Sequence, residues 1–315
     1  MANKITIIGA GNVGATIAND LVAMNIAQEI VLIDINQQKA FGEAMDIYQG
    51  VSFCSPAIVR PGDYPDAAGS DVVIITSGVA RKPGQTRLEL AQINVNILKQ
   101  ITPNIVKTAP DAIYIIVSNP VDVMTYVFTK ISGVPENHVI GSGTVLDTAR
   151  LQAELAKDFH ISPKNVHAHV YGEHGDSSFV PWSLATISNN NIAVYKQHAP
   201  DGDKIRFDGQ YDAFVEKVRT SGGTVIKAKG ATFYAVALSV CHIVRCIFTG
   251  AGTALTVSTV MHGEYGIDDV ALSVLCIVDG NGVRGKIRND LTEEEQNKLR
   301  FSAQKLKETL SAIEF

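Results

Sequence analysis

The chain has 315 residues, of which 46% are hydrophobic and 19% charged, a balance typical of a globular protein with a sizeable core. Its net charge of −5 and lack of a basic run argue against nucleic acid as a partner. No apolar stretch has the length of a membrane span and no signal peptide is visible, so we expect no membrane insertion and a cytoplasmic location. Cys241 and Cys246 lie in an apolar run, which is typical of buried thiols rather than metal ligands.

Short apolar runs alternate with helical periodicity through the first half of the chain. The predicted strands are residues 4–8, 30–34, 71–76, 112–117 and 138–141, and the first predicted helix is 13–24. Near-continuous apolar strands separated by helices indicate a parallel sheet covered on both faces. We therefore predict an α/β fold, with a Rossmann-type doubly wound domain over residues 1–145.

The second half reads as an α+β substrate domain over residues 146–315. Helical patterns cover 144–158 and 224–248, and residues 165–171 alternate like a strand. Near the end, Thr292 and the glutamates after it form a capping box before an amphipathic helix that runs to the C-terminus. No Pro/Gly/Ser linker separates the halves, so we expect them to pack tightly.

A glycine-rich motif of the form G-x-G-x-x-G follows the first strand and opens the first helix. Gly9 permits a tight turn, Gly11 lets the backbone approach a pyrophosphate, and Gly14 lets helix and strand pack closely. Asp34 ends the second strand, where an acid accepts hydrogen bonds from an adenosine ribose and repels a 2′-phosphate. These features favour NAD over NADP. The predicted cofactor-binding residues are Gly9, Gly11, Asn12, Val13, Gly14, Asp34 and Asn119.

Residues 77–87 follow the third strand and are therefore expected at the carboxyl edge of the sheet, where ligands bind. Gly78 and Gly84 are candidate hinges. Three cations, at positions 81, 82 and 87, lie between or beside them. We interpret this segment as a lid that carries positive charge onto an anionic substrate.

The segment Gly172-Glu173-His174-Gly175-Asp176 lies downstream of Asp147 and Arg150. A histidine, a carboxylate and an arginine are what reversible reduction of a 2-keto acid requires. The histidine supplies a proton, the aspartate orients its ring, and the arginine binds the substrate carboxylate with two hydrogen bonds. Taken singly, Arg150 also fits a helix salt bridge and His174 a core histidine. Together with the dinucleotide motif they favour an active site.

These motifs resemble the L-lactate/malate dehydrogenase family over essentially the whole chain. The matching blocks are residues 9–14, 82–87, 118–122, 141–150 and 172–177. The block at residues 172–177, together with residues 229–232, is similar to the lactate branch in particular.

The resemblance implies a role for each matching residue. His174 would donate and accept the proton, with Asp147 as its orienting partner. Arg150 would bind the substrate carboxylate, and Arg87 would polarise the reacting carbonyl after lid closure. Asn119 would contact the nicotinamide and the carbonyl oxygen. Hydride would pass between the substrate C2 and the nicotinamide, while the protein supplies position, field and a proton.

One loop position departs from the lactate pattern. Arg81 stands where the lactate branch typically has glutamine and the malate branch has arginine. In a closed site it would pair with a second carboxylate, and losing one partner of a buried ion pair costs roughly 3–5 kcal/mol. Thr232, expected to line the far side of the substrate pocket, matches the lactate branch instead. We expect an L-lactate dehydrogenase frame that also accepts oxaloacetate, with a functional malate dehydrogenase as the alternative. A solvent-facing Arg81 would remove this preference.

A second departure concerns regulation. Many bacterial lactate dehydrogenases bind fructose 1,6-bisphosphate through an arginine and a histidine at a subunit interface. His167 matches, but the arginine position holds Gln152, so we expect weak or no activation. His167 and His169 alternate on one strand face without a carboxylate or cysteine, so no metal is predicted. The resemblance implies a homotetramer or homodimer, with residues 236–244 as an apolar candidate surface or core.

Two other functions remain open from the sequence. The chain could be a non-catalytic dinucleotide sensor, although a pure binder would not need the intact set around His174. An epimerase or short-chain reductase would need a Tyr-x-x-x-Lys pair. The match at Tyr126 and Lys130 lies in an apolar helical stretch, and we interpret it as chance spacing.

Overall fold

The computed structural model describes residues 3–80, 84–205, 209 and 211–315, so the predictions for Arg81 and Lys82 lie outside the described residues. The helices are α1 Asn12–Ala23, α2 Gln37–Gly50, α3 Arg87–Thr108, α4 Val121–Ser132, α5 Val145–Phe159, α6 Ile192–His198, α7 Tyr211–Lys229, α8 Tyr234–Thr249 and α9 Glu293–Ser311. The strands are β1 Lys4–Ile8, β2 Glu29–Ile33, β3 Ile58–Pro61, β4 Val72–Ile75, β5 Ile113–Ile116, β6 Val139–Gly141, β7 Val166–His167, β8 Thr186–Ile187, β9 Asn190–Asn191, β10 Thr253–His262, β11 Asp268–Asp279 and β12 Gly282–Lys286.

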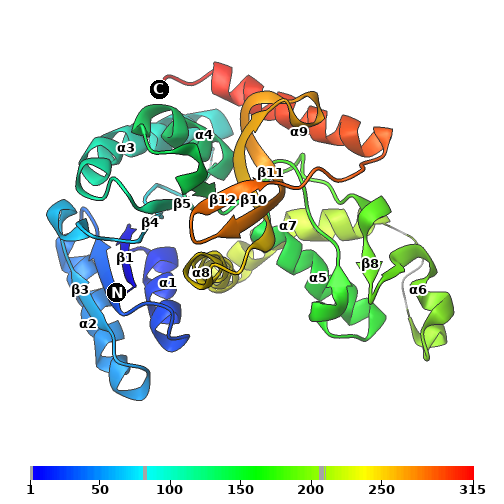
Figure 1. Cartoon of the computed structure of the whole chain (residues 1–315), viewed down its shortest axis with the longest axis horizontal. Coiled ribbons are helices and arrows are strands. Elements are labelled where there is room, and N and C mark those ends of the chain that lie inside the picture. Colours follow the sequence, from blue (N-terminus) through cyan, green and yellow to red (C-terminus); the bar gives the residue numbers. More distant parts are fainter. Residues whose placement is uncertain (1–2, 81–83, 206–208, 210) are drawn as a thin grey trace.

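The first half forms a parallel sheet in the order β3-β2-β1-β4-β5-β6, which confirms the doubly wound prediction. All five predicted strands are present, because each is a β-branched run buried on both faces. Helices α1, α2 and α8 lie on one side of this sheet and α3 and α4 on the other (Figure 1). The strand order reverses between β1 and β4, so the crevice at their carboxyl ends is the expected ligand site.

The sheet continues into the second half without a break. Strand β10 pairs antiparallel with β6 at Ser258 and Gly141, and β11 and β12 extend it to nine strands. One hydrophobic core runs through both halves, which confirms the expected tight packing. Sequence reading missed β3 and the β10–β12 strands. Strand β10 is buried along most of its length, and the alternation of apolar and hydroxyl side chains over residues 255–258 breaks off at Thr259, so its sequence gives only a short strand signal.

Two predictions for the second half were wrong. The pattern over 224–248 is not one helix, because α7 ends at Lys229, Gly230 adopts φ +86°, and α8 begins at Tyr234. The strand predicted over 165–171 shrinks to β7 and an isolated bridge between Tyr171 and Phe179. Between them the backbone bonds to side chains instead of a neighbouring strand.

The C-terminal helix α9 begins as predicted. The Thr292 hydroxyl accepts from the Glu295 backbone N–H at 3.2 Å, and the Glu295 carboxylate accepts from the Thr292 N–H at 3.0 Å. The helix ends at Ser311 and packs on β11 beside α4 (Figure 1). Among the described residues, no helix combines the length and apolarity needed to cross a membrane.

Candidate active site

A cleft of about 510 Å³ lies at the carboxyl edge of the parallel sheet and brings residues of both halves together. Its walls come from the ends of β4, β5 and β6, from the start of α5, and from α7 and α8. Six of the predicted site residues line it: Val13, Asn119, Asp147, Arg150, His174 and Thr232.

The glycine-rich turn has the geometry that its three glycines predict. Gly9 has φ +108°, and a Cβ there would stand 2.7 Å from the Thr76 hydroxyl. A Cβ on Gly14 would overlap the Gly9 carbonyl oxygen, so only glycine lets α1 pack against the turn. At Gly11 a Cβ would meet nothing within 4 Å, which leaves the backbone open to an approaching ligand.

Asp34 lies beside this turn at the end of β2. Its carboxylate accepts the Ala10 N–H at 2.7 Å and the Asn36 N–H at 2.8 Å. Gly11 caps α1 without a side-chain hydrogen bond, so the N–H groups of the first turn face the space above the turn. The carboxylate of Asp34 suits the ribose of NAD, and the uncapped start of α1 suits its pyrophosphate.

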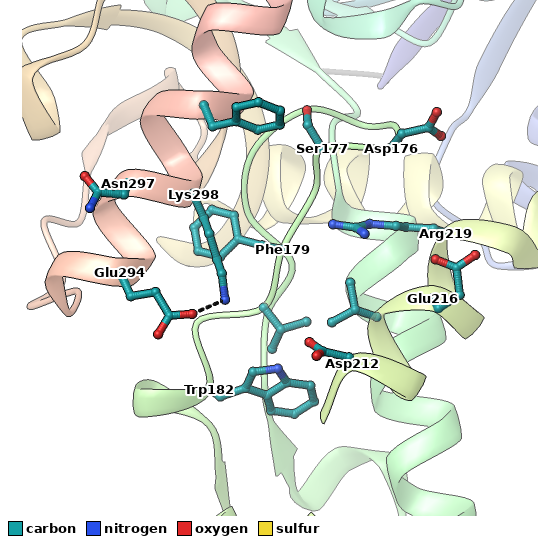
Figure 2. Close-up of a pocket in the computed structure, with 13 residues that line it drawn as sticks. Asp176, Ser177, Phe179, Trp182, Asp212, Glu216, Arg219, Glu294, Asn297 and Lys298 are labelled. Carbon is teal, nitrogen blue, oxygen red and sulfur yellow. Dashed lines mark ion pairs between the residues drawn. The ribbon is translucent and has the colours of Figure 1, made fainter. Parts of the chain in front are cut away.

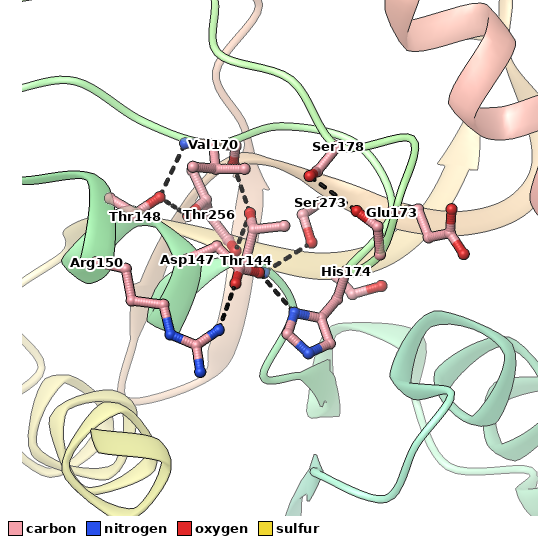
Figure 3. Close-up of polar contacts among 12 residues, drawn as sticks. Thr144, Asp147, Thr148, Arg150, Val170, Glu173, His174, Ser178, Thr256 and Ser273 are labelled. Atoms are coloured by element: carbon pink, nitrogen blue, oxygen red, sulfur yellow. Dashed lines mark hydrogen bonds and ion pairs between the residues drawn. The ribbon is translucent and has the colours of Figure 1, made fainter. Parts of the chain in front are cut away.

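The predicted catalytic residues meet in the cleft as a hydrogen-bonded chain (Figure 3). His174 Nδ1 lies 2.5 Å from Asp147 Oδ2, and Arg150 Nη1 donates to Asp147 Oδ1 at 3.1 Å. Asp147 is in the first turn of α5 with its side chain 8% exposed, whereas that of His174 is 27% exposed. Asp147 thus bonds to both the His174 ring and the Arg150 guanidinium. Nε2 is the ring nitrogen of His174 that does not face Asp147.

The electrostatics of this chain favour a protonated histidine. The charge of Asp147 raises the pKa of His174 to about 9, against the opposing effect of burial. Burial would raise the pKa of Asp147, but the charges and hydrogen bonds of His174 and Arg150 outweigh it and lower this pKa. The pair is therefore an imidazolium and a carboxylate near neutral pH.

Buried hydroxyl groups hold the segment of the chain that leads to His174 (Figure 3). The Thr144 hydroxyl donates to the Val170 carbonyl at 2.5 Å, and the Thr148 hydroxyl accepts the Val170 N–H at 2.9 Å. Gly172 and Ser273 exchange two backbone hydrogen bonds, at 2.9 and 3.0 Å. Helix α5 and strand β11 therefore both hold the catalytic segment.

Arg87 occupies a different position from the one its assignment to the lid predicted. It is the first residue of α3, after the capping residue Thr86, and so belongs to a helix rather than to the loop. Its Nη2 pairs with Asp176 Oδ2 at 2.6 Å, with both side chains largely exposed. Asp176 lines the cleft but Arg87 does not.

Sequence reading missed several residues around the cleft. Asn94 in α3 is buried, donates to the Asn119 carbonyl at 2.7 Å and accepts the Val79 N–H at 2.8 Å. Gly222 and Gly223 face the cleft from inside α7, where a Cβ on Gly222 would lie 3.6 Å from Arg150. A polar residue at a core-facing position of α3 and paired glycines inside a helix were the available signals.

A second cavity, of about 650 Å³, lies between α7, α9 and the segment after His174 (Figure 2). Trp182, Phe179 and Lys298 line it, and Lys298 pairs with Glu294 at 2.7 Å. Arg219 borders both cavities. The described residues that line this larger cavity include no histidine, so the smaller cleft is the candidate active site.

The remaining candidates lie elsewhere. Gln152 donates to the Ala168 carbonyl at 3.3 Å, and His167 is exposed on β7. No group of three or more potential metal ligands occurs among the residues that the structure describes. Tyr126 and Lys130 both bond to Asp269 and neither lines the cleft, so they do not form a reductase pair there.

Comparisons with known proteins agree with this geometry. The lactate/malate dehydrogenase NAD-binding domain model matches residues 3–141, and the alpha/beta C-terminal domain model of the same family matches 144–314. An L-lactate dehydrogenase of Clostridium botulinum (strain Hall) is 47% identical over 310 residues, covering 98% of this chain and 96% of that protein. L-lactate dehydrogenase 1 of Clostridium acetobutylicum is 46% identical over 312 residues and 98% of each chain.

Solved structures give the same result. A lactate dehydrogenase from a deep-sea metagenome library has a TM-score of 0.94 and 37% identity, over 99% of both chains. The minor L-lactate dehydrogenase of Enterococcus mundtii, in its ligands-bound form, has a TM-score of 0.94 and 36% identity, over 100% of this chain and 99% of its own.

Proposed function

The chain belongs to the lactate/malate dehydrogenase family and is an NAD-dependent oxidoreductase acting on CH–OH groups, and we propose that it interconverts pyruvate and L-lactate and also accepts oxaloacetate. The observation that carries this proposal is the Arg150–Asp147–His174 chain in a cleft beside the glycine-rich turn. We also propose that residues 1–145 form the NAD-binding unit and 146–315 the substrate unit.

His174 is the proposed acid in reduction and base in oxidation. Its Nδ1 is held by Asp147, so Nε2 is the nitrogen that presents the proton to the substrate oxygen. Bound NADH supplies the hydride. Because the charge of Asp147 raises the pKa of His174 to about 9, the ring is protonated at neutral pH and ready to donate.

Arg150 is the proposed carboxylate-binding residue. One of its guanidinium nitrogens is fixed by Asp147, and this hydrogen bond orients the remaining donors. Arg87 is proposed to polarise the substrate carbonyl, which requires it to leave Asp176. An exposed ion pair of this kind contributes at most about 1 kcal/mol, so binding of an anionic substrate is sufficient to break it.

Arg81 is the proposed selector between pyruvate and oxaloacetate. The support is chemical, since an arginine in the loop offers a bidentate partner to the second carboxylate of oxaloacetate. Thr232 lines the cleft, as expected for the lactate-type frame. The test is kcat/KM with NADH for both substrates, in the wild type and in Arg81→Gln. We expect R81Q to lower the oxaloacetate value by roughly two decades or more and to leave pyruvate unchanged or improved.

Three results would change this proposal. If wild-type pyruvate reduction exceeds oxaloacetate reduction by about a hundredfold, Arg81 does not read the second carboxylate. If oxaloacetate is strongly preferred, the chain is functionally a malate dehydrogenase. If neither substrate turns over while NADH still binds, the sensor function becomes the better description.

We propose weak or no activation by fructose 1,6-bisphosphate. The amide of Gln152 is neutral and donates to the Ala168 carbonyl, so His167 has no cationic partner at that position. The same kinetic assay with and without the sugar bisphosphate tests this. A large fall in the KM for pyruvate at micromolar effector would contradict it.

We also propose a cytoplasmic homo-oligomer, a tetramer or dimer, that acts in pyruvate metabolism and glycolysis. Most of residues 236–244 are core, but large apolar side chains remain exposed on several helices, among them α2 and α8. On α2 they are Phe41, Met45 and Tyr48, spaced on one helix face, and on α8 they are Tyr234 and Leu238. Exposed apolar groups of this size favour burial against a second copy.

A further inference from the structure

Asp122 is a buried carboxylate that contacts the catalytic loop from the other half of the chain. It lies in the first turn of α4 and is 2% exposed. Its Oδ2 accepts the backbone N–H of His174 at 2.7 Å, and its Oδ1 accepts the hydroxyl of Ser258 at 2.6 Å. One carboxylate therefore joins α4, the His174 loop and β10.

The position of Asp122 in the chain connects these contacts with the ligand end of the cleft. Asn119, which lines the cleft, immediately precedes the proline before α4, and its carbonyl accepts from Asn94 at 2.7 Å. Ser258 is paired with Gly141, the last residue of β6. This short segment therefore places Asn119 in the wall of the cleft and Asp122 in contact with the backbone of His174.

A neutral hydrogen-bond acceptor would also satisfy the His174 N–H, so this hydrogen bond alone does not explain why residue 122 is a carboxylate. Burial raises the pKa of Asp122 to about 6, although the hydrogen bonds from Ser258 and His174 oppose the rise. Asp122 is therefore ionised at neutral pH inside the core. Keeping an isolated charge there is unfavourable unless it is hydrogen-bonded and interacts with an opposite charge.

We propose that Asp122 is a positioning residue for the reaction, one that fixes the backbone of His174 and whose negative charge stabilises the imidazolium. The inference rests on the proposed function of His174. The charged groups that act on the ring are Asp147 and Arg150 from α5 and Asp122 from α4, and Glu173 of the His174 loop acts on Asp122. Asp147 dominates and Arg150 opposes, so the charge of Asp122 adds a smaller contribution of the same sign as that of Asp147.

The decisive variant is Asp122→Asn, which retains the shape and removes the charge. The amide oxygen can still accept the His174 N–H, while the amide nitrogen donates to Ser258. We expect the pH midpoint of kcat/KM for pyruvate reduction to move down by roughly half a unit or more. The Kd for NADH should stay within about twofold. Asp279→Asn is the matched control, since Asp279 is also buried but bonds to Asn281 and pairs with Arg284 instead of facing His174.

A midpoint in D122N that equals that of wild type and D279N would overturn the proposal, even if the variant is less stable, because a purely structural role leaves the pH profile in place. If D122N fails to fold, Ser258→Ala decides. It frees one carboxylate oxygen, and we expect kcat to fall several-fold with NADH binding retained. Ser70→Ala is its control, because this variant also loses a buried hydrogen bond between two hydroxyl groups, those of Ser70 before β4 and Thr6. An unchanged kcat in S258A would then overturn the proposal.

The wild-type assay separates this inference from the proposed function. Wild-type protein that binds NADH but reduces no 2-keto acid would refute the proposed function and the role of Asp122 with it. An active wild type with D122N indistinguishable from it would refute the role of Asp122 alone.

Discussion

Replacing Asp147 by asparagine should convert a catalytic histidine that is protonated throughout the neutral range into one that titrates near neutrality. In the wild type the Asp147 carboxylate accepts from His174 Nδ1 at 2.5 Å and its charge raises the pKa of His174 to about 9, above the ordinary value of 6.5. The difference corresponds to roughly 3 kcal/mol of interaction favouring the imidazolium. Burial of the ring opposes protonation, so without Asp147 the pKa should fall to 6.5 or lower.

The sign of the effect follows from the direction of the reaction. Reduction needs the imidazolium, so wild-type kcat/KM for pyruvate should stay level through neutral pH and fall as pH rises through about 9. In D147N the same fall should occur near or below pH 6.5, and at pH 8 the protonated fraction should drop to a few per cent. The asparagine also offers one oxygen acceptor in place of two, so it can bond to His174 or to Arg150 but not to both, and kcat/KM at that pH should decrease about a hundredfold or more.

The assay is initial-rate NADH consumption between about pH 5 and pH 10, with Asp158→Asn in the same helix as control. The oxidation of L-lactate should show the opposite trend, because it needs the neutral ring. In D147N the KM for pyruvate should also rise, since Arg150 loses the charge of Asp147 and competes with His174 for the single amide oxygen. A D147N profile that still falls near pH 9 would refute the assignment of the His174 pKa to Asp147.

Three further predictions follow from other parts of the molecule. Asp34→Ser should raise the KM for NADH and improve the use of NADPH, because it removes the charge that repels a 2′-phosphate; an unchanged cofactor ratio would argue against this role. Gly222→Ala and Gly223→Ala should each raise the free energy of unfolding by about 0.5–1 kcal/mol in urea titrations, since neither glycine has positive φ, a Cβ on Gly223 meets nothing within 4 Å, and one on Gly222 lies 3.6 Å from Arg150, an ordinary van der Waals contact. Both should reduce activity on bulky 2-keto acids more than on pyruvate, and an equal loss on all substrates would exclude a role in pocket size. Met45→Asp with Leu238→Asp should lower the mass measured by light scattering, and an unchanged mass would place the interface elsewhere.

Features with local causes could be predicted from the order of the amino acids alone. Each of the predicted parallel strands is a β-branched run that must be buried, and the capping box at Thr292 satisfies the N–H groups next to it in the chain. The glycine-rich turn could be predicted because its φ of +108° at Gly9 and its close helix contact at Gly14 exclude other residues. His174, Asp147 and Arg150 could be named because the chemistry requires those groups.

Which groups contact one another across long separations in the chain depends on packing. Strands β10 and β11 were not predicted, because the alternation in β10 is short and β11 is a nearly continuous apolar run, which periodicity alone does not distinguish from a buried helix. Helices α7 and α8 both pack on α5, and the partner of Arg87 depends on where the His174 loop lies. Asp122 belongs to the matching block at residues 118–122, but the sequence assigned it no role. Its contact with His174 exists because α4 and β10 meet under that loop, and side-chain pairing of this kind is fixed by packing rather than by sequence neighbours.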